Sequence, residues 1–151
     1  MEPVIVVKEF TFDSAHRLDN PYLDPKVSAE LFGKCFELHG HTYHLFVAVK
    51  GSVNERSGMV INFVDLKKIV TNEIINVLDH KYLNEVGELK GIVVTCENML
   101  IWMWEKLVNA IPNLYELKLY ETPTSYAIYR GPTSLKELNL ADTVNLKENV
   151  R

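Results

Sequence analysis

The chain has 151 residues, a length that favours one domain able to bury a substantial core. Its 47% hydrophobic and 24% charged residues are typical of a soluble globular protein, and a net charge of −4 gives no basic surface for nucleic acid. No apolar run is long enough to cross a membrane and no basic-then-apolar segment opens the chain, so we expect a cytoplasmic protein with no membrane partner. In a reducing cytosol, Cys35 and Cys96 are expected to remain free thiols.

The first third of the chain predicts two strands separated by a loop. Residues 4–12 are β-branched and aromatic, which predicts a strand leading into His16. Residues 17–34 contain two prolines and several turn-forming polar residues, so they are predicted as a long loop. Apolar and polar residues then alternate over 41–50, which predicts a second strand before a polar turn.

The periodicity then becomes helical. Apolar residues recur at helical spacing over 63–78, which predicts an amphipathic helix. A second helix is predicted after Thr95 as its N-cap, with Glu97 in the first turn, where the helix dipole favours an acidic residue. Its predicted buried stripe is Leu100, Trp104, Leu107, Val108 and Ile111. We expect Trp102 on the opposite, polar side, where a lone exposed indole would favour an oligomer.

Two more strands are predicted, one ending at Glu121 and one over 125–130. The order ββααββ predicts an α+β fold in which two helices cover one face of an antiparallel four-stranded sheet. Residues 1–131 are taken as one catalytic domain. Residues 132–151 are taken as a C-terminal extension, for which we predict no particular structure.

Three histidines form a candidate metal site. His39 and His41 are two residues apart, so on an extended backbone their side chains point to one face, and Gly40 between them leaves room for a close approach. His16 lies at the end of another extended run. Three histidine ligands with an open fourth position are typical of catalytic zinc, Zn²⁺, although a histidine pair at this spacing also arises by chance. Strand alternation places His44 on the other face and excludes it as a ligand.

A thiol lies close to this pair in the sequence. Cys35 precedes His39 by four positions, so its sulfur could sit beside the metal without binding it. The alternative is an inert, small apolar side chain, which is the commoner role of an isolated cysteine. Cys96 is interpreted as a packing residue.

Six motifs in consistent order resemble the family of 6-pyruvoyl-tetrahydropterin and 6-carboxy-tetrahydropterin synthases. They are FDSAHRL at 12–18, CFELHGH at 35–41, GMVINFVDLKK at 58–68, LDHKYLN at 78–84, TCEN at 95–98 and YET at 120–122. They are spread through the region 5–131, so the resemblance covers most of the chain and leaves out the tail.

The resemblance implies a tunnelling fold, in which three subunits close their sheets into a barrel and two trimers stack into a homohexamer with active sites at subunit interfaces. It implies zinc on His16, His39 and His41. The implied substrate is 7,8-dihydroneopterin triphosphate.

The resemblance also implies roles for further side chains. Cys35 would abstract a proton, and Asp79 with His80 would form an acid/base pair supplied by a neighbouring subunit. Glu121 would anchor the pterin ring, and Thr95 and Glu97 are assigned with it to substrate binding. The alternatives are that His80 only marks a helix end and that Glu121 is a solvated strand-end charge.

The product depends on details of the motifs. Three residues separate Cys35 from His39, which resembles the bacterial synthases of queuosine biosynthesis. We therefore expect 6-carboxy-5,6,7,8-tetrahydropterin, with loss of acetaldehyde and triphosphate. Asn62 and the TCEN motif resemble the animal form, so the alternative is a 6-pyruvoyl-tetrahydropterin synthase that eliminates triphosphate.

Two further alternatives remain. Glu37 raises the possibility of a glutamate base, as in a subgroup that cleaves dihydroneopterin to 6-hydroxymethyldihydropterin. A non-catalytic pterin-binding or zinc-binding protein would have no need of Cys35, Asp79 and His80 together, so their joint presence favours an enzyme.

Overall fold

A five-stranded sheet forms the base of the molecule in the computed structural model, which describes residues 2–132. The strand order is β3-β1-β2-β4-β5. The strands are β1 (Val4–His16), β2 (His39–Gly51), β3 (Lys81–Tyr82), β4 (Leu114–Thr122) and β5 (Ser125–Tyr129). The predicted C-terminal extension, 132–151, lies outside the described residues apart from its first residue.

The two long strands β1 and β2 pair antiparallel over 13 residues each, from Val4 opposite Gly51 to His16 opposite His39. Alternate side chains point into the core, where Phe12 and Tyr43 stack at 4.8 Å between ring centroids. β1 thus runs four residues beyond the predicted end at residue 12, because its pairing with β2 continues. This pairing brings both strand ends, with their histidines, side by side.

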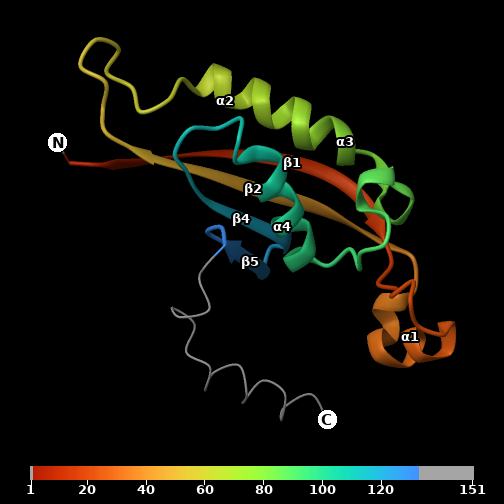
Figure 1. Cartoon of the computed structure of the whole chain (residues 1–151). Coiled ribbons are helices and arrows are strands. Elements are labelled where there is room, and N and C mark those ends of the chain that lie inside the picture. Colours follow the sequence, from red (N-terminus) through yellow and green to blue (C-terminus); the bar gives the residue numbers. More distant parts are fainter. Residues whose placement is uncertain (1, 133–151) are drawn as a thin grey trace, which may run out of the picture.

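The helices between residues 63 and 107 form a second layer over one face of the sheet (Figure 1). α2 (Phe63–Val70), a single π-helical turn η2 (Thr71–Ile75) and α3 (Asn76–Leu78) follow one another without interruption, which confirms the helix predicted over 63–78. Asn62 caps it by accepting a hydrogen bond from the backbone N–H of Val64 at 2.8 Å. These helices contact β1, whereas α4 (Cys96–Leu107) contacts β4 and β5.

The core lies between these two layers. It is formed by apolar side chains that are almost fully buried, among them Phe12, Tyr43, Leu45, Leu117 and Leu119 from the sheet and Leu66, Ile74, Met99, Met103 and Leu107 from the helices. In residues 2–132 no helix combines the length and the apolar character that crossing a membrane requires.

α4 begins as predicted but buries a slightly different set of residues. The Thr95 hydroxyl accepts a hydrogen bond from the Asn98 N–H at 3.2 Å, which confirms the N-cap. Val108 was wrongly placed in the buried stripe: the helix ends at Leu107, and Val108 is 41% exposed. Trp102 is half-buried against the core, with the Lys106 ammonium 5.9 Å from its ring, so it is not the exposed indole that was expected.

The segment predicted as a loop over 17–34 contains a helix, so that prediction was wrong. α1 (Pro25–Phe32) starts at Asp24, whose carboxylate accepts a hydrogen bond from the Lys26 N–H at 2.9 Å. Proline at the first helical position and an aspartate before it form a regular helix start. Gly33, with a φ of 57°, ends the helix and leads into the short 3₁₀ helix η1 (Gly33–Phe36).

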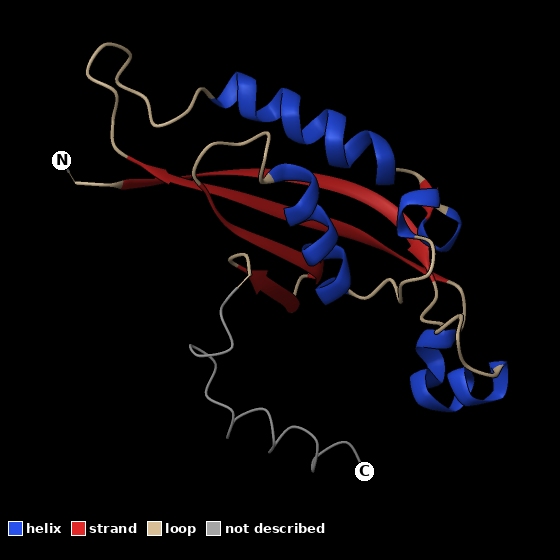
Figure 2. Cartoon of the chain, in the orientation of Figure 1, coloured by secondary structure: helices blue, strands red, loops and turns tan. Residues whose placement is uncertain are grey.

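The sheet, red in Figure 2, has five strands, one more than predicted. β3 pairs parallel with β1 through only two residues, Ser14 with Lys81 and Ala15 with Tyr82. A strand this short has no readable alternation, so the sequence pattern missed it. Two further 3₁₀ turns, η3 (Leu83–Glu85) and η4 (Gly87–Leu89), connect it towards α4. The predicted α+β class and the antiparallel pairing of the other four strands are confirmed.

Candidate active site

Three histidines meet where the ends of β1 and β2 lie together. His16 is the last residue of β1, and His39 and His41 are the first and third residues of β2. The ring centroids are 4.6 Å apart for His16 and His39, 5.1 Å for His16 and His41, and 5.0 Å for His39 and His41. One nitrogen of each ring lies within 4.8 Å of the others, close enough to hold one ion. The strand register thus brings together the residues that spacing grouped, while zinc itself stays a prediction.

Backbone carbonyls orient two of the rings. Nδ1 of His16 lies 2.9 Å from the Val94 carbonyl oxygen, and Nδ1 of His39 lies 2.7 Å from that of Glu37. A carbonyl oxygen only accepts hydrogen bonds, so each Nδ1 carries the proton and each Nε2 presents its lone pair. Nε2 of His16 and of His41 are buried without a hydrogen-bond partner in the described part of the chain. Buried unpaired nitrogens are costly, and a metal ion would satisfy them.

Burial also favours the neutral form of His16 and His41. It lowers the pKa of His16 to about 4, with the Val94 carbonyl opposing the shift and the neighbouring histidines adding to it. Burial likewise lowers the pKa of His41, although the nearby Glu121 carboxylate acts in the opposite direction. A neutral imidazole is the form that binds a metal, so the donor set suits Zn²⁺.

Glu121, near the end of β4, lies next to the histidine cluster. Its Oε1 is 3.6 Å from Nε2 of His16 and 3.6 Å from Nε2 of His41. Its side chain is 29% exposed, so the carboxylate has one side in the site and one side open. It is therefore not the solvated strand-end charge of the alternative interpretation, and it is available to a ligand beside the cluster.

Cys35 lies in η1, just before the paired histidines. It is half-buried, and its sulfur is not among the ligand atoms that converge on the candidate metal position, which are nitrogens of His16, His39 and His41. Its carbonyl accepts a hydrogen bond from the Leu18 N–H at 2.8 Å. Glu37 is exposed, and its backbone carbonyl accepts the hydrogen bond from Nδ1 of His39.

Asp79 and His80 follow α3 and bind β1 through its backbone. Asp79 accepts a hydrogen bond from the Asp13 N–H at 3.0 Å, and the His80 N–H donates to the Asp13 carbonyl at 2.7 Å. The Asp13 N–H and then His80 lower the pKa of Asp79. His80 has a φ of 58°, a left-handed conformation that is uncommon for a residue other than glycine. Its Nδ1 lies 3.0 Å from the Asp79 carboxylate.

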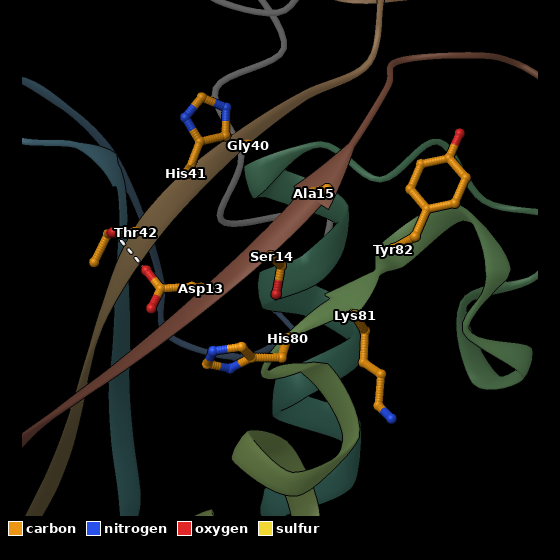
Figure 3. Close-up of a pocket in the computed structure, with 9 residues that line it drawn as sticks. All are labelled: Asp13, Ser14, Ala15, Gly40, His41, Thr42, His80, Lys81 and Tyr82. Carbon is orange, nitrogen blue, oxygen red and sulfur yellow. Dashed lines mark hydrogen bonds between the residues drawn. The ribbon is translucent and has the colours of Figure 1, made fainter.

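His80 does not join the histidine cluster of its own chain. It lies beside Asp13 in an open cleft of about 580 Å³, and the ring of His41 points away from it (Figure 3). Asp13 and its register partner Thr42 alternate with the buried Phe12 and Tyr43, so they face away from the helices. Within one chain, the Asp79–His80 pair therefore lies on the opposite face of the sheet from the histidines.

The other predicted side chains have simpler surroundings. The Thr95 hydroxyl caps α4, and Glu97 is exposed in its first turn. Nδ1 of His44 lies 2.7 Å from the Glu9 carboxylate, on the face away from the cluster. Cys96 is buried, which raises the pKa of its thiol to about 12, and its sulfur donates to the Leu119 carbonyl.

Sequence reasoning missed two contributors to the site. The Val94 carbonyl orients His16, and the buried Tyr43 hydroxyl lies 3.4 Å from the same ring nitrogen. A backbone carbonyl has no side-chain signature. Tyr43 sits two residues after His41 on the same face of β2, a spacing that could have pointed to it.

Known proteins resemble this chain along almost its whole described length. The family model of 6-pyruvoyl tetrahydropterin synthase matches residues 5–132. A 6-pyruvoyl tetrahydrobiopterin synthase of Dictyostelium discoideum is 42% identical over 130 residues, covering 85% of this chain and 96% of that protein. A Homo sapiens protein of the same name is 37% identical over 131 residues, covering 83% and 90%.

The fold gives the same result. The structure of Caenorhabditis elegans 6-pyruvoyl tetrahydropterin synthase aligns with a TM-score of 0.83 at 35% identity, covering 87% of this chain and 98% of that one. The sheet with helices on one face and the histidines at its strand ends therefore define a pterin-synthase-like protein. The chain belongs to the 6-pyruvoyl tetrahydropterin synthase family.

Proposed function

We propose that this protein is a zinc-dependent lyase that converts 7,8-dihydroneopterin triphosphate to 6-pyruvoyl-tetrahydropterin by eliminating triphosphate. The observation that carries the proposal is the cluster of His16, His39 and His41, whose unpaired Nε2 atoms lie beside the Glu121 carboxylate. The choice of product is supported by the relatives, since the family model and the curated proteins that match carry the 6-pyruvoyl name.

The proposed chemistry follows from the residue types. Zn²⁺ held by His16, His39 and His41 would act as a Lewis acid towards the oxygens of the substrate side chain. Cys35, as a thiolate, would remove a proton from an adjacent side-chain carbon. Glu121 would hold the pterin ring by accepting two parallel hydrogen bonds from its amino-pyrimidinone edge.

The Asp79–His80 pair fits the role of proton carrier in a shared site. An imidazole can both take up and release a proton, and the Asp79 carboxylate 3.0 Å away can orient it. Because the pair lies on the face opposite the histidine cluster, we propose that it serves the site of another subunit. Thr95 and Glu97 are retained as candidate substrate contacts, although Thr95 also has a capping role in α4.

The 6-carboxy product expected from the short spacing between Cys35 and His39 has less support. That expectation rested on one insertion length, whereas the relatives resemble the chain along 80% or more of its length. Asn62, which resembled the animal form in the sequence, caps α2 and so also has a structural reason to be present.

The test is to incubate zinc-loaded protein with 7,8-dihydroneopterin triphosphate and identify the products by mass. We expect 6-pyruvoyl-tetrahydropterin and triphosphate. Formation of 6-carboxy-tetrahydropterin with acetaldehyde, formation of 6-hydroxymethyldihydropterin, or binding without turnover would each replace the proposal with one named alternative.

The same assay identifies the base. Cys35→Ala should bind zinc at the wild-type stoichiometry and lose nearly all turnover, because the thiol is not among the converging ligand atoms. Glu37→Gln is the matched variant, since Glu37 is exposed and contributes to the cluster only through its backbone carbonyl. A greater loss in Glu37→Gln than in Cys35→Ala would make the glutamate the base.

A further inference from the structure

A side-chain amide extends the pairing of β1 beyond its last residue. The Arg17 N–H donates to Oδ1 of Asn84 at 3.0 Å, and Nδ2 of Asn84 donates back to the Arg17 carbonyl at 2.9 Å. Arg17 and Asn84 continue the register in which Ala15 lies opposite Tyr82. The backbone after Tyr82 turns into η3, so the amide of Asn84 replaces the backbone groups that would otherwise pair.

Arg17 and the residue after it contact η1, the 3₁₀ helix that carries Cys35. The Leu18 N–H donates to the Cys35 carbonyl at 2.8 Å. The guanidinium of Arg17 lies 4.5 Å from the centre of the Phe36 ring, within the range of a cation–π contact. The same guanidinium donates a hydrogen bond to the Asp19 carboxylate at 2.7 Å. Two consecutive residues after His16 therefore contact two consecutive residues of η1.

The other end of this turn is tied to the histidine cluster, through the bond between Nδ1 of His39 and the Glu37 carbonyl. Cys35 thus sits between two anchors, one on β1 and one on β2. We propose that Asn84 and Arg17 are positioning residues that fix the Cys35 thiol relative to the three histidines. The inference rests on the proposed role of Cys35 as the base, and it adds two residues that act through that thiol.

A competing role for Arg17 would be direct binding of the substrate's phosphates. Its guanidinium already has a carboxylate partner in Asp19 and an aromatic face in Phe36. The Asp19 carboxylate offsets the charge that a phosphate would need, and the Phe36 ring lies against the planar surface. The geometry therefore favours a positioning role for Arg17. The two roles differ in kinetics: loss of a phosphate ligand raises KM, whereas displacement of the base lowers kcat.

The test compares Asn84→Ala, Asn84→Asp and Arg17→Lys with the wild type. Asn84→Asp keeps the acceptor and loses the donor, and Arg17→Lys keeps the charge and loses the planar stacking group. Arg130→Lys is the matched control, because Arg130 also pairs with a carboxylate, Glu116 at 2.8 Å, and lies 5.7 Å from the ring of Tyr115.

Three quantities are measured on zinc-loaded protein: zinc per chain, kcat and KM for 7,8-dihydroneopterin triphosphate, and the rate at which iodoacetamide alkylates Cys35. Alkylation is followed by peptide mass, which separates Cys35 from Cys96. It is measured at pH 10, where ionisation of an ordinary thiol no longer limits the rate.

We expect Asn84→Ala to alkylate about tenfold faster, because two hydrogen bonds that keep the turn closed are lost. Asn84→Asp and Arg17→Lys should show smaller increases. In all three, kcat should fall with KM within about twofold and zinc unchanged, and Arg130→Lys should match the wild type.

The inference is overturned if Cys35 alkylation is unchanged in all three variants. It is also overturned if KM rises at constant kcat, which would make Arg17 a phosphate ligand, or if zinc is lost, which would mean that the histidines are what these residues position. If the wild type has no turnover, the proposed function fails, while alkylation and zinc content still decide whether Asn84 and Arg17 hold the turn.

Discussion

At the scale of single residues, the site depends on which nitrogen of each ring is left without a proton. The Val94 and Glu37 carbonyls accept hydrogen bonds from the Nδ1–H groups of His16 and His39, so both Nε2 atoms can bind a metal. The face of β2 decides which histidines take part: His39 and His41 share one face, while His44 points to the other and pairs with Glu9. Metal binding and proton binding at these rings can be tested separately.

Zinc binding is tested by removing one member of the cluster. His39→Ala should lose most of the zinc, because two ligands bind the ion far more weakly than three. His44→Ala is the control, since that ring lies on the opposite face and should leave zinc at the wild-type level. Metal analysis of the purified variants decides the matter, and full zinc content in His39→Ala would refute the assignment.

The buried His16 should make the stability of the zinc-free protein depend on pH. Its folded pKa is about 4, whereas an unfolded histidine titrates near 6.5. Between these values the unfolded chain binds more protons, so the free energy of unfolding falls as the pH is lowered from 6.5 to 4. We expect a loss of about 3 kcal/mol, measured by urea denaturation at constant protein concentration.

His16→Asn is the control for this pH dependence, because it keeps a polar side chain and has no titrating ring. Its stability should fall distinctly less over the same pH range. An equal fall in both proteins would mean that other groups dominate the titration.

At the scale of elements, two short segments place the reactive groups. η1 carries Cys35 between the end of α1 and the start of β2. The turn after α3 carries His80, whose left-handed backbone lets its N–H reach the Asp13 carbonyl. A strained backbone of this kind is tolerated where the surrounding bonds determine it, and it recurs at functional sites.

The conformation of His80 predicts an unusual order of stabilities. His80→Gly should be about 1 kcal/mol more stable than His80→Ala, because glycine adopts a positive φ without a steric cost. At the neighbouring Lys81 in β3 the order should reverse, with Lys81→Ala more stable than Lys81→Gly. Urea denaturation of the four variants at one protein concentration tests this, and the same order at both positions would contradict it.

At the scale of the whole molecule, the sheet face away from the helices is only partly polar. Val7 on β1 and Tyr126 and Ile128 on β5 lie on it and are 49%, 52% and 45% exposed. Apolar side chains exposed on a sheet face favour association with another protein surface. The same face carries His80, so association would bring it to a second chain, as the proposed sharing of the site between subunits requires.

A mixing experiment tests this shared site. His39→Ala and His80→Ala should each be nearly inactive alone. Refolded together in equal amounts, they should regain activity, because random mixing leaves about a quarter of the sites with both halves intact. His39→Ala refolded with itself is the control. A monomeric mass by light scattering, or no recovery in a mixture shown to have exchanged subunits, would place each site within one chain.

The sequence determined the elements that are long enough to show a period. Strands with strict alternation and a helix over 63–78 have local patterns that packing does not override, so both their type and their order could be predicted. The same alternation placed His39 and His41 together and removed His44, because side-chain direction in a strand follows from the backbone alone. The family motifs then identified the class of enzyme.

The tertiary structure decided what depends on partners distant in sequence. β3 exists only because Asp13 and Ser14 offer it a strand edge, and two residues are too few to show a pattern of their own. His80 and the histidine cluster lie on opposite faces of the sheet because of the register between β1 and β3. The spacing of residues in the sequence does not predict that register. The Val94 carbonyl reaches His16 across 78 positions of the chain, and only folding brings the two together.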